Sequence, residues 1–228
     1  MVDFINFIKL FGGFVYLLVG GDLLVRGSLG LAREKNLSPV IVGMTIVAMG
    51  TSAPELMVSG YSALSGHPGI AVGNVVGSNI ANVLLVMGIP ALIYPISFAQ
   101  DGLLRQTSLM AIMSFLLILM LIFEPITKLE GICLLIILAF FLVMTTRGAA
   151  VMPGLDDPEE EMKKEFGLPS STAAIILLVI LGIVMLPLGA NLVVDGAAGL
   201  AGSWGVSEAV IGLSLIALGT SLPELSTT

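Results

Sequence analysis

Apolar runs of about 20 residues dominate this chain of 228 residues. A helix needs about 20 apolar residues to cross the hydrocarbon core of a bilayer. The runs do not alternate apolar and polar residues, as the strands of an outer-membrane barrel would over about ten residues. Only 11% of the residues are charged, against about 25% in a soluble domain. The sequence therefore predicts an all-α polytopic membrane protein that is embedded in the lipid bilayer.

Seven apolar segments predict seven membrane helices, at about 4–32, 39–64, 69–94, 103–123, 126–146, 171–201 and 207–228. A polar linker, 147–170, separates the fifth from the sixth and holds six of the sixteen acidic residues. Lys and Arg are more frequent after the first, third and fifth helices than after the second and fourth. Because such loops remain in the cytoplasm, we expect a cytoplasmic 147–170 loop and an N-terminus outside.

An internal repeat organises the predicted helices. When the chain is shifted by 169 residues, residues 20–59 align with 189–228 without a gap, and sixteen of the forty positions are identical. The shift spans five predicted helices. Because five is odd, the second copy must enter the membrane from the opposite side, as in the inverted repeats of secondary transporters. We therefore predict a first inverted half at 1–146, the loop 147–170, and the start of a second half at 171–228.

The best-matched part of the repeat is a polar hexapeptide inside an apolar run. It reads Gly50-Thr51-Ser52-Ala53-Pro54-Glu55 in the first copy and Gly219-Thr220-Ser221-Leu222-Pro223-Glu224 in the second. An acidic residue at the centre of a membrane helix costs about 2.5–3.5 kcal/mol. Each proline also lacks an N–H group, which frees a backbone carbonyl four residues earlier. Irregular backbone at this depth is tolerated only where it lines a cavity or is buried in protein.

The hexapeptides carry oxygen ligands and no thiol or imidazole. Carboxylate, hydroxyl and carbonyl oxygens suit hard cations such as calcium, which takes six to eight of them, and the absence of sulfur and nitrogen ligands argues against zinc and copper. We expect a cation site built by Glu55, Glu224, Thr51, Ser52, Thr220 and Ser221. The alternative is a proline kink in which each glutamate is satisfied by one neighbour.

The third predicted helix adds polar residues to a packing face. Glycines spaced four apart, at positions 69, 73 and 77, are typical of close helix packing. Ser78 and Asn82 share a helix face, at positions i and i+4, and can add hydroxyl and amide oxygens to the site or form interhelical hydrogen bonds. The role of Asn74, one turn before Ser78, stays open.

Other polar residues are interpreted as structural. Asp22 and Arg26, at i and i+4, predict a pair near the membrane interface, with Asn191 and Asp195 at the equivalent repeat positions. His67 in a short loop is expected to be solvated. The sequence has no basic stripe, so we expect no nucleic-acid partner. Because Cys133 is the single cysteine, a disulfide within the chain is excluded.

The first hexapeptide and the stretch 73–79 together resemble the first α-repeat of the calcium/cation antiporter superfamily, and most of all its prokaryotic sodium/calcium exchangers. The resemblance implies ten helices in two inverted halves of five, of which about seven are present here. It places the first α-repeat at about 39–94, the second from about 207, and the ions between helices two, three, seven and eight. Because the eighth to tenth helices are missing, we expect the chain to be a fragment of a longer exchanger.

Carried over by this resemblance, Glu55 and Glu224 are the principal carboxylates. The hydroxyl and amide ligands are Thr51, Ser52, Thr220, Ser221, Ser78 and Asn82. The main-chain carbonyls of Ala48 and Ala217 line the sodium positions. Helices one and six are implied to slide and so open the site to each side in turn.

The predicted function is exchange of sodium for calcium by alternating access, in a prokaryotic inner membrane, with no enzymatic activity and no cofactor. The alternative is a calcium/proton antiporter, but proton-coupled relatives tend to carry a further acid near Ser78 and Asn82, which this sequence lacks.

A third class is a cation channel or a non-transporting membrane partner. A channel needs weak binding at several sites along a pore, which paired carboxylates do not favour. The oligomeric state stays open.

Overall fold

The computed structural model describes residues 2–34, 48–94, 103–123, 126–149 and 171–226, and all of its regular elements are helices. The first six segments from the N-terminus are α1 (Val2–Glu34), α3 with α4 (Ala48–Thr51, Ala53–Leu64), α5 with η2 and α6 (Pro68–Ala81, Asn82–Val86, Gly88–Ile93), α7 (Leu103–Phe123), α8 (Lys128–Ala149) and α10 (Thr172–Trp204). The seventh comprises α11 (Glu208–Ile211), η3 (Gly212–Ile216), α12 (Ala217–Thr220) and α13 (Leu222–Ser226).

The predicted all-helical class with seven segments is confirmed over the described residues; the start of the second segment, 39–47, lies outside them. Within the described ranges, four segments are long and apolar enough to cross a membrane by length and composition: Val2–Glu34, Pro68–Ile93, Thr172–Trp204 and Glu208–Leu225.

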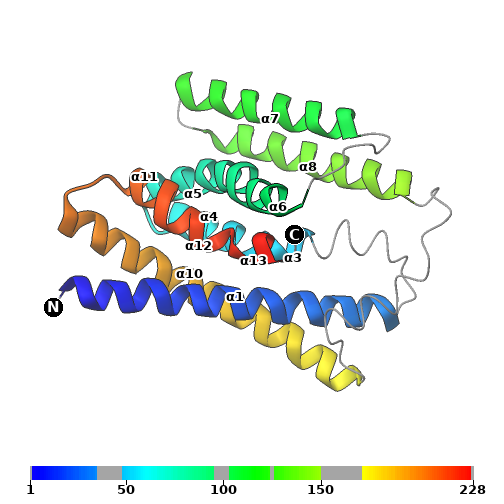
Figure 1. Cartoon of the computed structure of the whole chain (residues 1–228), viewed down its shortest axis with the longest axis horizontal. Coiled ribbons are helices and arrows are strands. Elements are labelled where there is room, and N and C mark those ends of the chain that lie inside the picture. The colour runs from blue at the N-terminus through cyan, green and yellow to red at the C-terminus, as the bar shows by residue number, and fades with distance from the viewer. Residues whose placement is uncertain (1, 35–47, 95–102, 124–125, 150–170, 227–228) are drawn as a thin grey trace. The chain divides into compact units, whose positions relative to one another are not determined.

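The helices form two compact units (Figure 1). One contains α1 to α6 together with α10 to α13, and the other contains α7 and α8. In the second unit, Thr127 and Glu130 cap α8 reciprocally: the Thr127 N–H donates to Glu130 Oε2 at 2.7 Å, and the Glu130 N–H donates to Thr127 Oγ1 at 3.3 Å. The larger unit joins helices from both predicted halves, so the repeats interlock rather than fold separately.

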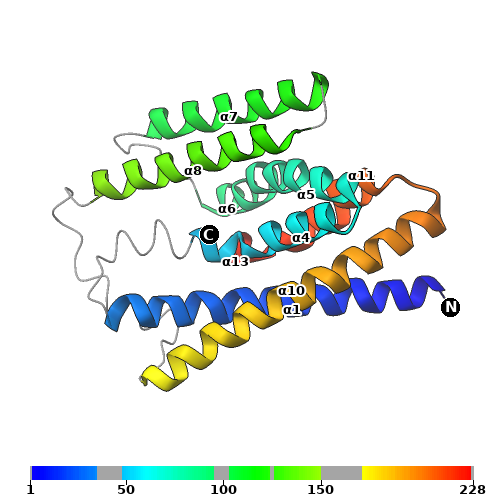
Figure 2. The ribbon, with the colours of Figure 1, turned by 180° about the vertical axis from the view of Figure 1, so that it is seen from behind.

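The crossing of α1 and α10 is the most extensive helix contact of the larger unit, and the two helices run antiparallel (Figures 1 and 2). Contacts step forward along α1 and backward along α10, from Gly13 with Val193, to Gly20 with Leu186, to Gly27 with Val179. Glycines seven residues apart line both helices, at 13, 20 and 27 and at 182, 189 and 196. Such a spacing keeps one seam facing the partner helix, and the missing side chains allow the backbones to touch.

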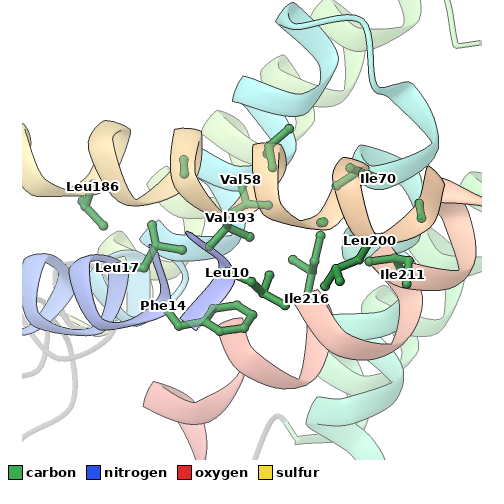
Figure 3. Packing of buried hydrophobic residues seen from close by; sticks show 14 of the residues in the cluster. Leu10, Phe14, Leu17, Val58, Ile70, Leu186, Val193, Leu200, Ile211 and Ile216 are labelled. Atoms are coloured by element: carbon green, nitrogen blue, oxygen red, sulfur yellow. The ribbon is translucent and has the colours of Figure 1, made fainter. Parts of the chain in front are cut away.

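The hydrophobic core lies where this crossing meets the hexapeptide helices (Figure 3). It contains Leu10, Phe14 and Leu17 of α1, Leu186, Val193 and Leu200 of α10, and Val58, Ile70, Ile211 and Ile216 of the segments packed against them. The same helix α1 fixes both hexapeptides through their first glycines. The Phe14 ring packs against Gly219, and the Val25 side chain packs against Gly50.

Candidate cation site

Each hexapeptide interrupts its helix at a single serine. Ser52, between α3 and α4, has φ −85° and ψ 6°, and Ser221, between α12 and α13, has φ −84° and ψ 4°. The hydrogen bonds around the two breaks also correspond: the serine carbonyl accepts the N–H of Leu56 at 3.1 Å in one copy and of Leu225 at 3.3 Å in the other. The repeated sequence therefore produces the same local backbone twice, as the prolines predict.

The carbonyl that Pro54 frees lies against helix α1. The oxygen of Gly50 and the Pro54 ring both lie against Gly21 of α1, each 3.7 Å from the point where a Cβ on Gly21 would be. Such carbonyls are predicted to be possible ligands, and the first of them lies at the contact between α3 and α1. The proline contributes by setting the break at Ser52.

The carbonyls of Ala48 and Ala217, predicted to line sodium positions, are each held within their own copy. Each accepts the N–H of the serine at the break, at 3.3 Å in the first copy and 3.1 Å in the second. Each also accepts the threonine hydroxyl, from Thr51 at 3.2 Å and from Thr220 at 3.3 Å. A carbonyl has two lone pairs, so a cation could bind there once the hydroxyl turns away.

The two hexapeptides meet across the repeat. Ser52 Oγ of the first copy donates a hydrogen bond to Glu224 Oε1 of the second, at 3.1 Å. The carboxylates of Glu55 and Glu224 are half-buried and near enough to interact electrostatically. Two negative charges brought together in an apolar surrounding repel each other unless a cation lies between them or one takes up a proton.

Several buried oxygens of this cluster accept no hydrogen bond from the described residues. They are both carboxylate oxygens of Glu55, the amide oxygen of Asn82 and the hydroxyl of Ser221. Leaving a buried polar group unsatisfied costs about 1–3 kcal/mol. These groups are all oxygen ligands, which fits a hard cation. The segment η2, which begins at Asn82, has π-helical geometry, often found at functional sites.

Ser78 is buried beside the cluster, but its hydroxyl donates to the carbonyl of Val75 in its own helix at 3.2 Å. Asn79 also donates to Val75, at 2.8 Å, and is exposed. Of the third-helix residues singled out from the sequence, the structure thus leaves only Asn82 with a buried oxygen that has no partner among the described residues.

Asn74, which the sequence left open, is completely buried at the centre of the cluster. Its Nδ2 donates to Ser59 Oγ at 3.0 Å and to the Glu55 carbonyl at 3.4 Å, while its Oδ1 accepts from Thr220 Oγ1 at 3.1 Å. Sequence reasoning left the role of Asn74 open and missed Ser59. The available signal was the shared face of Asn74 and Ser78, four residues apart in an otherwise apolar helix.

Polar residues outside the cluster form pairs within one helix or between neighbouring elements. Asp22 and Arg26 form the predicted pair at 2.9 Å, and Asp195 pairs with Lys9 at 3.6 Å. Asn191 donates to the hydroxyl of Tyr61, which connects α10 to α4. His67 is not simply solvated as predicted: its Nδ1 lies 2.6 Å from Glu208 Oε1, so it connects the α4–α5 loop with the start of α11.

Replacing Pro54 by Ala is expected to weaken calcium binding by the complete protein about tenfold, as other supporting changes around a metal site do. The new N–H can donate to Gly50 and continue the helix through Ser52, which would move the Ser52 hydroxyl away from Glu224. Isothermal titration with calcium measures this. Pro68→Ala is the matched control, because Pro68 lies in the first turn of α5, where no N–H is needed. Equal affinities in both variants would exclude a role for the break.

The chain is similar to known proteins over most of its length. The family model described as sodium/calcium exchanger protein matches residues 5–147 and 174–228. CaxA of Alkalimonas amylolytica, which its name assigns to the antiporters, is 40% identical over 214 residues, and the inner membrane protein YrbG of Escherichia coli is 34% identical over 217 residues; each alignment covers 94% of this chain and 67% of the relative. A solved structure of the sodium-calcium exchanger NCX_Mj soaked with sodium and strontium superposes with a TM-score of 0.55 at 33% identity, covering 99% of this chain and 71% of the other.

Proposed function

Because the chain belongs to the sodium/calcium exchanger family, a family of cation antiporters rather than enzymes, we propose that the complete protein exchanges sodium for calcium by alternating access. The observation that carries this proposal is the contact between Ser52 and Glu224, which brings the two repeat copies and their carboxylates to one place. The proposal places this exchange in a prokaryotic inner membrane, with the N-terminus outside and the 147–170 loop in the cytoplasm.

In the proposed mechanism, both ions compete for the same oxygens. Calcium, with two charges, binds between the carboxylates of Glu55 and Glu224. Neighbouring hydroxyl and amide oxygens complete its coordination shell. We assign these roles to Thr51, Ser52, Thr220, Ser221, Ser78 and Asn82, and the sodium positions to the carbonyls of Ala48 and Ala217. Sodium ions that occupy the neutral oxygens lower the affinity for calcium, so each ion displaces the other.

Alternating access needs one part of the protein to move against another around a fixed site. The crossing of α1 and α10 suits this role because its glycines present backbone rather than interlocking side chains, and because α1 packs on both hexapeptides, at Gly50 and Gly219. A shift of α1 along the glycine seam would therefore change the packing at both helix breaks. This motion is part of the proposal.

The test is to load liposomes containing the complete gene product with sodium at a fixed pH and measure calcium uptake. We expect uptake when sodium is diluted outside, and none when only a pH gradient is imposed. Uptake that follows the pH gradient instead would establish a calcium/proton antiporter. Uptake with neither gradient would indicate a channel, and would overturn exchange altogether.

A further inference from the structure

Asn74 hydrogen-bonds to both copies of the hexapeptide, and also to Ser59 in the helix turn that follows the first copy. It is 0% exposed, and its two ends face different copies. The Nδ2 end donates to the Glu55 carbonyl and to Ser59, both in α4. The Oδ1 end accepts from Thr220 in α12. A buried amide with partners at both ends fixes the distance between the elements that it joins.

The Thr220 hydroxyl has one proton and three acceptors within reach. Asn74 Oδ1 lies at 3.1 Å and the Ala217 carbonyl at 3.3 Å, and the Glu55 carboxylate is near enough to interact. A carboxylate is ordinarily the strongest of these acceptors. The Thr220 hydroxyl nevertheless stays short of an ordinary hydrogen-bond geometry to Glu55, although the two groups are close enough to interact. The amide of Asn74 therefore competes with Glu55 for this proton.

The direction of the Thr220 proton determines which oxygen lone pairs remain available to a cation. A hydroxyl that donates to Asn74 keeps its two lone pairs for other partners. The Thr220 oxygen can then face a cation as a ligand, and the Glu55 oxygens remain available as well. If the proton turned toward Glu55, it would occupy one carboxylate oxygen and point a positive hydrogen toward the place where the cation should bind.

We propose that Asn74 is a positioning residue of the cation site: it holds the Thr220 proton away from Glu55 and fixes the two repeat copies at the spacing that the cation needs. Asn74 does not itself bind the ion in this proposal. The inference rests on the proposed function, because it assumes that Glu55 and Thr220 are cation ligands.

The experiment measures calcium binding by titration calorimetry on the complete gene product in detergent, with thermal unfolding measured on the same samples. Asn74→Ala is expected to weaken calcium binding about 10- to 100-fold, the range found when residues that orient metal ligands are removed. In a Thr220→Val background the same change should have little further effect, because the hydroxyl that Asn74 controls is gone. A merely structural role would instead give the same loss in both backgrounds.

Two further variants keep the test decisive if Asn74→Ala does not fold. Asn74→Asp retains the acceptor for Thr220, and the Ser59 hydroxyl can donate to its other oxygen, although the hydrogen bond to the Glu55 carbonyl is lost. Calcium affinity should therefore stay closer to that of the wild type than the 10- to 100-fold loss expected for Asn74→Ala. Ser62→Ala is the matched control: Ser62 is also completely buried, but its hydroxyl donates to Val58 in its own helix at 2.6 Å, and its removal should leave affinity unchanged.

The possible failures are distinguishable. If the wild type binds no calcium, the proposed function fails, and this inference fails with it. If the wild type binds calcium and Asn74→Ala binds it equally well, only the inference fails. A loss in Asn74→Asp of the full 10- to 100-fold expected for Asn74→Ala, or additive losses in the double variant, would likewise overturn the positioning role while leaving the exchanger intact.

Discussion

Glu55→Gln in the complete protein is expected to abolish calcium exchange while the protein folds normally. The substitution keeps the shape of the side chain and removes one of the two negative charges that calcium needs. Changes around a metal ligand already lower affinity about 10- to 100-fold, so loss of a ligand charge should lower it by about 100-fold or more. Calcium uptake into liposomes, driven by a sodium gradient, measures the effect.

The thermal stability of Glu55→Gln should not fall with its calcium exchange. The Glu55 carboxylate oxygens accept no hydrogen bond of ordinary geometry from the described residues, so the substitution breaks none. Burying a neutral group is also less unfavourable than burying a charge. Without calcium, the variant should therefore unfold at the wild-type temperature or above. Glu34→Gln, at the exposed end of α1, is the control and should exchange calcium normally. Retained exchange in Glu55→Gln would rule out the ligand role.

Gly73→Ala should destabilise the protein by about 1–3 kcal/mol, the usual range for overpacking a tight contact. A Cβ at position 73 would lie 2.5 Å from the Ala209 carbonyl oxygen and 2.8 Å from the Leu213 nitrogen. Both are backbone atoms, so no side-chain rotation can relieve the clash and α5 must move away from the second repeat. Because α5 also carries Asn74 and Ser78, calcium affinity should fall with the unfolding temperature.

Gly60→Ala is the matched control for this change. Gly60 lies in the interior of α4, and a Cβ there would meet nothing within 4 Å. Alanine favours a helix interior by about 1 kcal/mol over glycine, so this variant should unfold at the same temperature or higher. If thermal unfolding of Gly73→Ala matched that of Gly60→Ala, the tight approach of α5 to the second repeat would be disproved.

The helical class, the seven segments and the position of both breaks were predictable from the sequence, because local physics decides them. A long apolar run can satisfy its backbone in lipid only as a helix. A proline in such a run removes one helix hydrogen bond, and two residues before Pro54 and Pro223 the serines Ser52 and Ser221 adopt nearly the same dihedral angles. Proline alone does not decide the break, because Pro187 lies inside the continuous helix α10. The family was also predictable, since the repeated hexapeptide carries the resemblance that the family match confirms.

The partners of the polar groups were not predictable in the same way. From sequence alone, Ser52 was a ligand candidate like Ser221, but the structure joins Ser52 to Glu224 and gives Ser221 no equivalent contact among the described residues. The Pro54 break was predicted to free a carbonyl as a possible ligand, and that carbonyl lies against α1.

The sequence by itself thus determined which residues can lie at membrane depth, where the helices break and which oxygens are available to a cation. The tertiary structure alone decided that α1 and α10 cross along a glycine seam and that Asn74 connects the two repeat copies. The reason is physical: a break depends on neighbours within one turn, whereas the partner of a buried amide depends on which distant helix approaches it. Asn74 and Thr220 are 146 residues apart in the chain, and only packing brings them together.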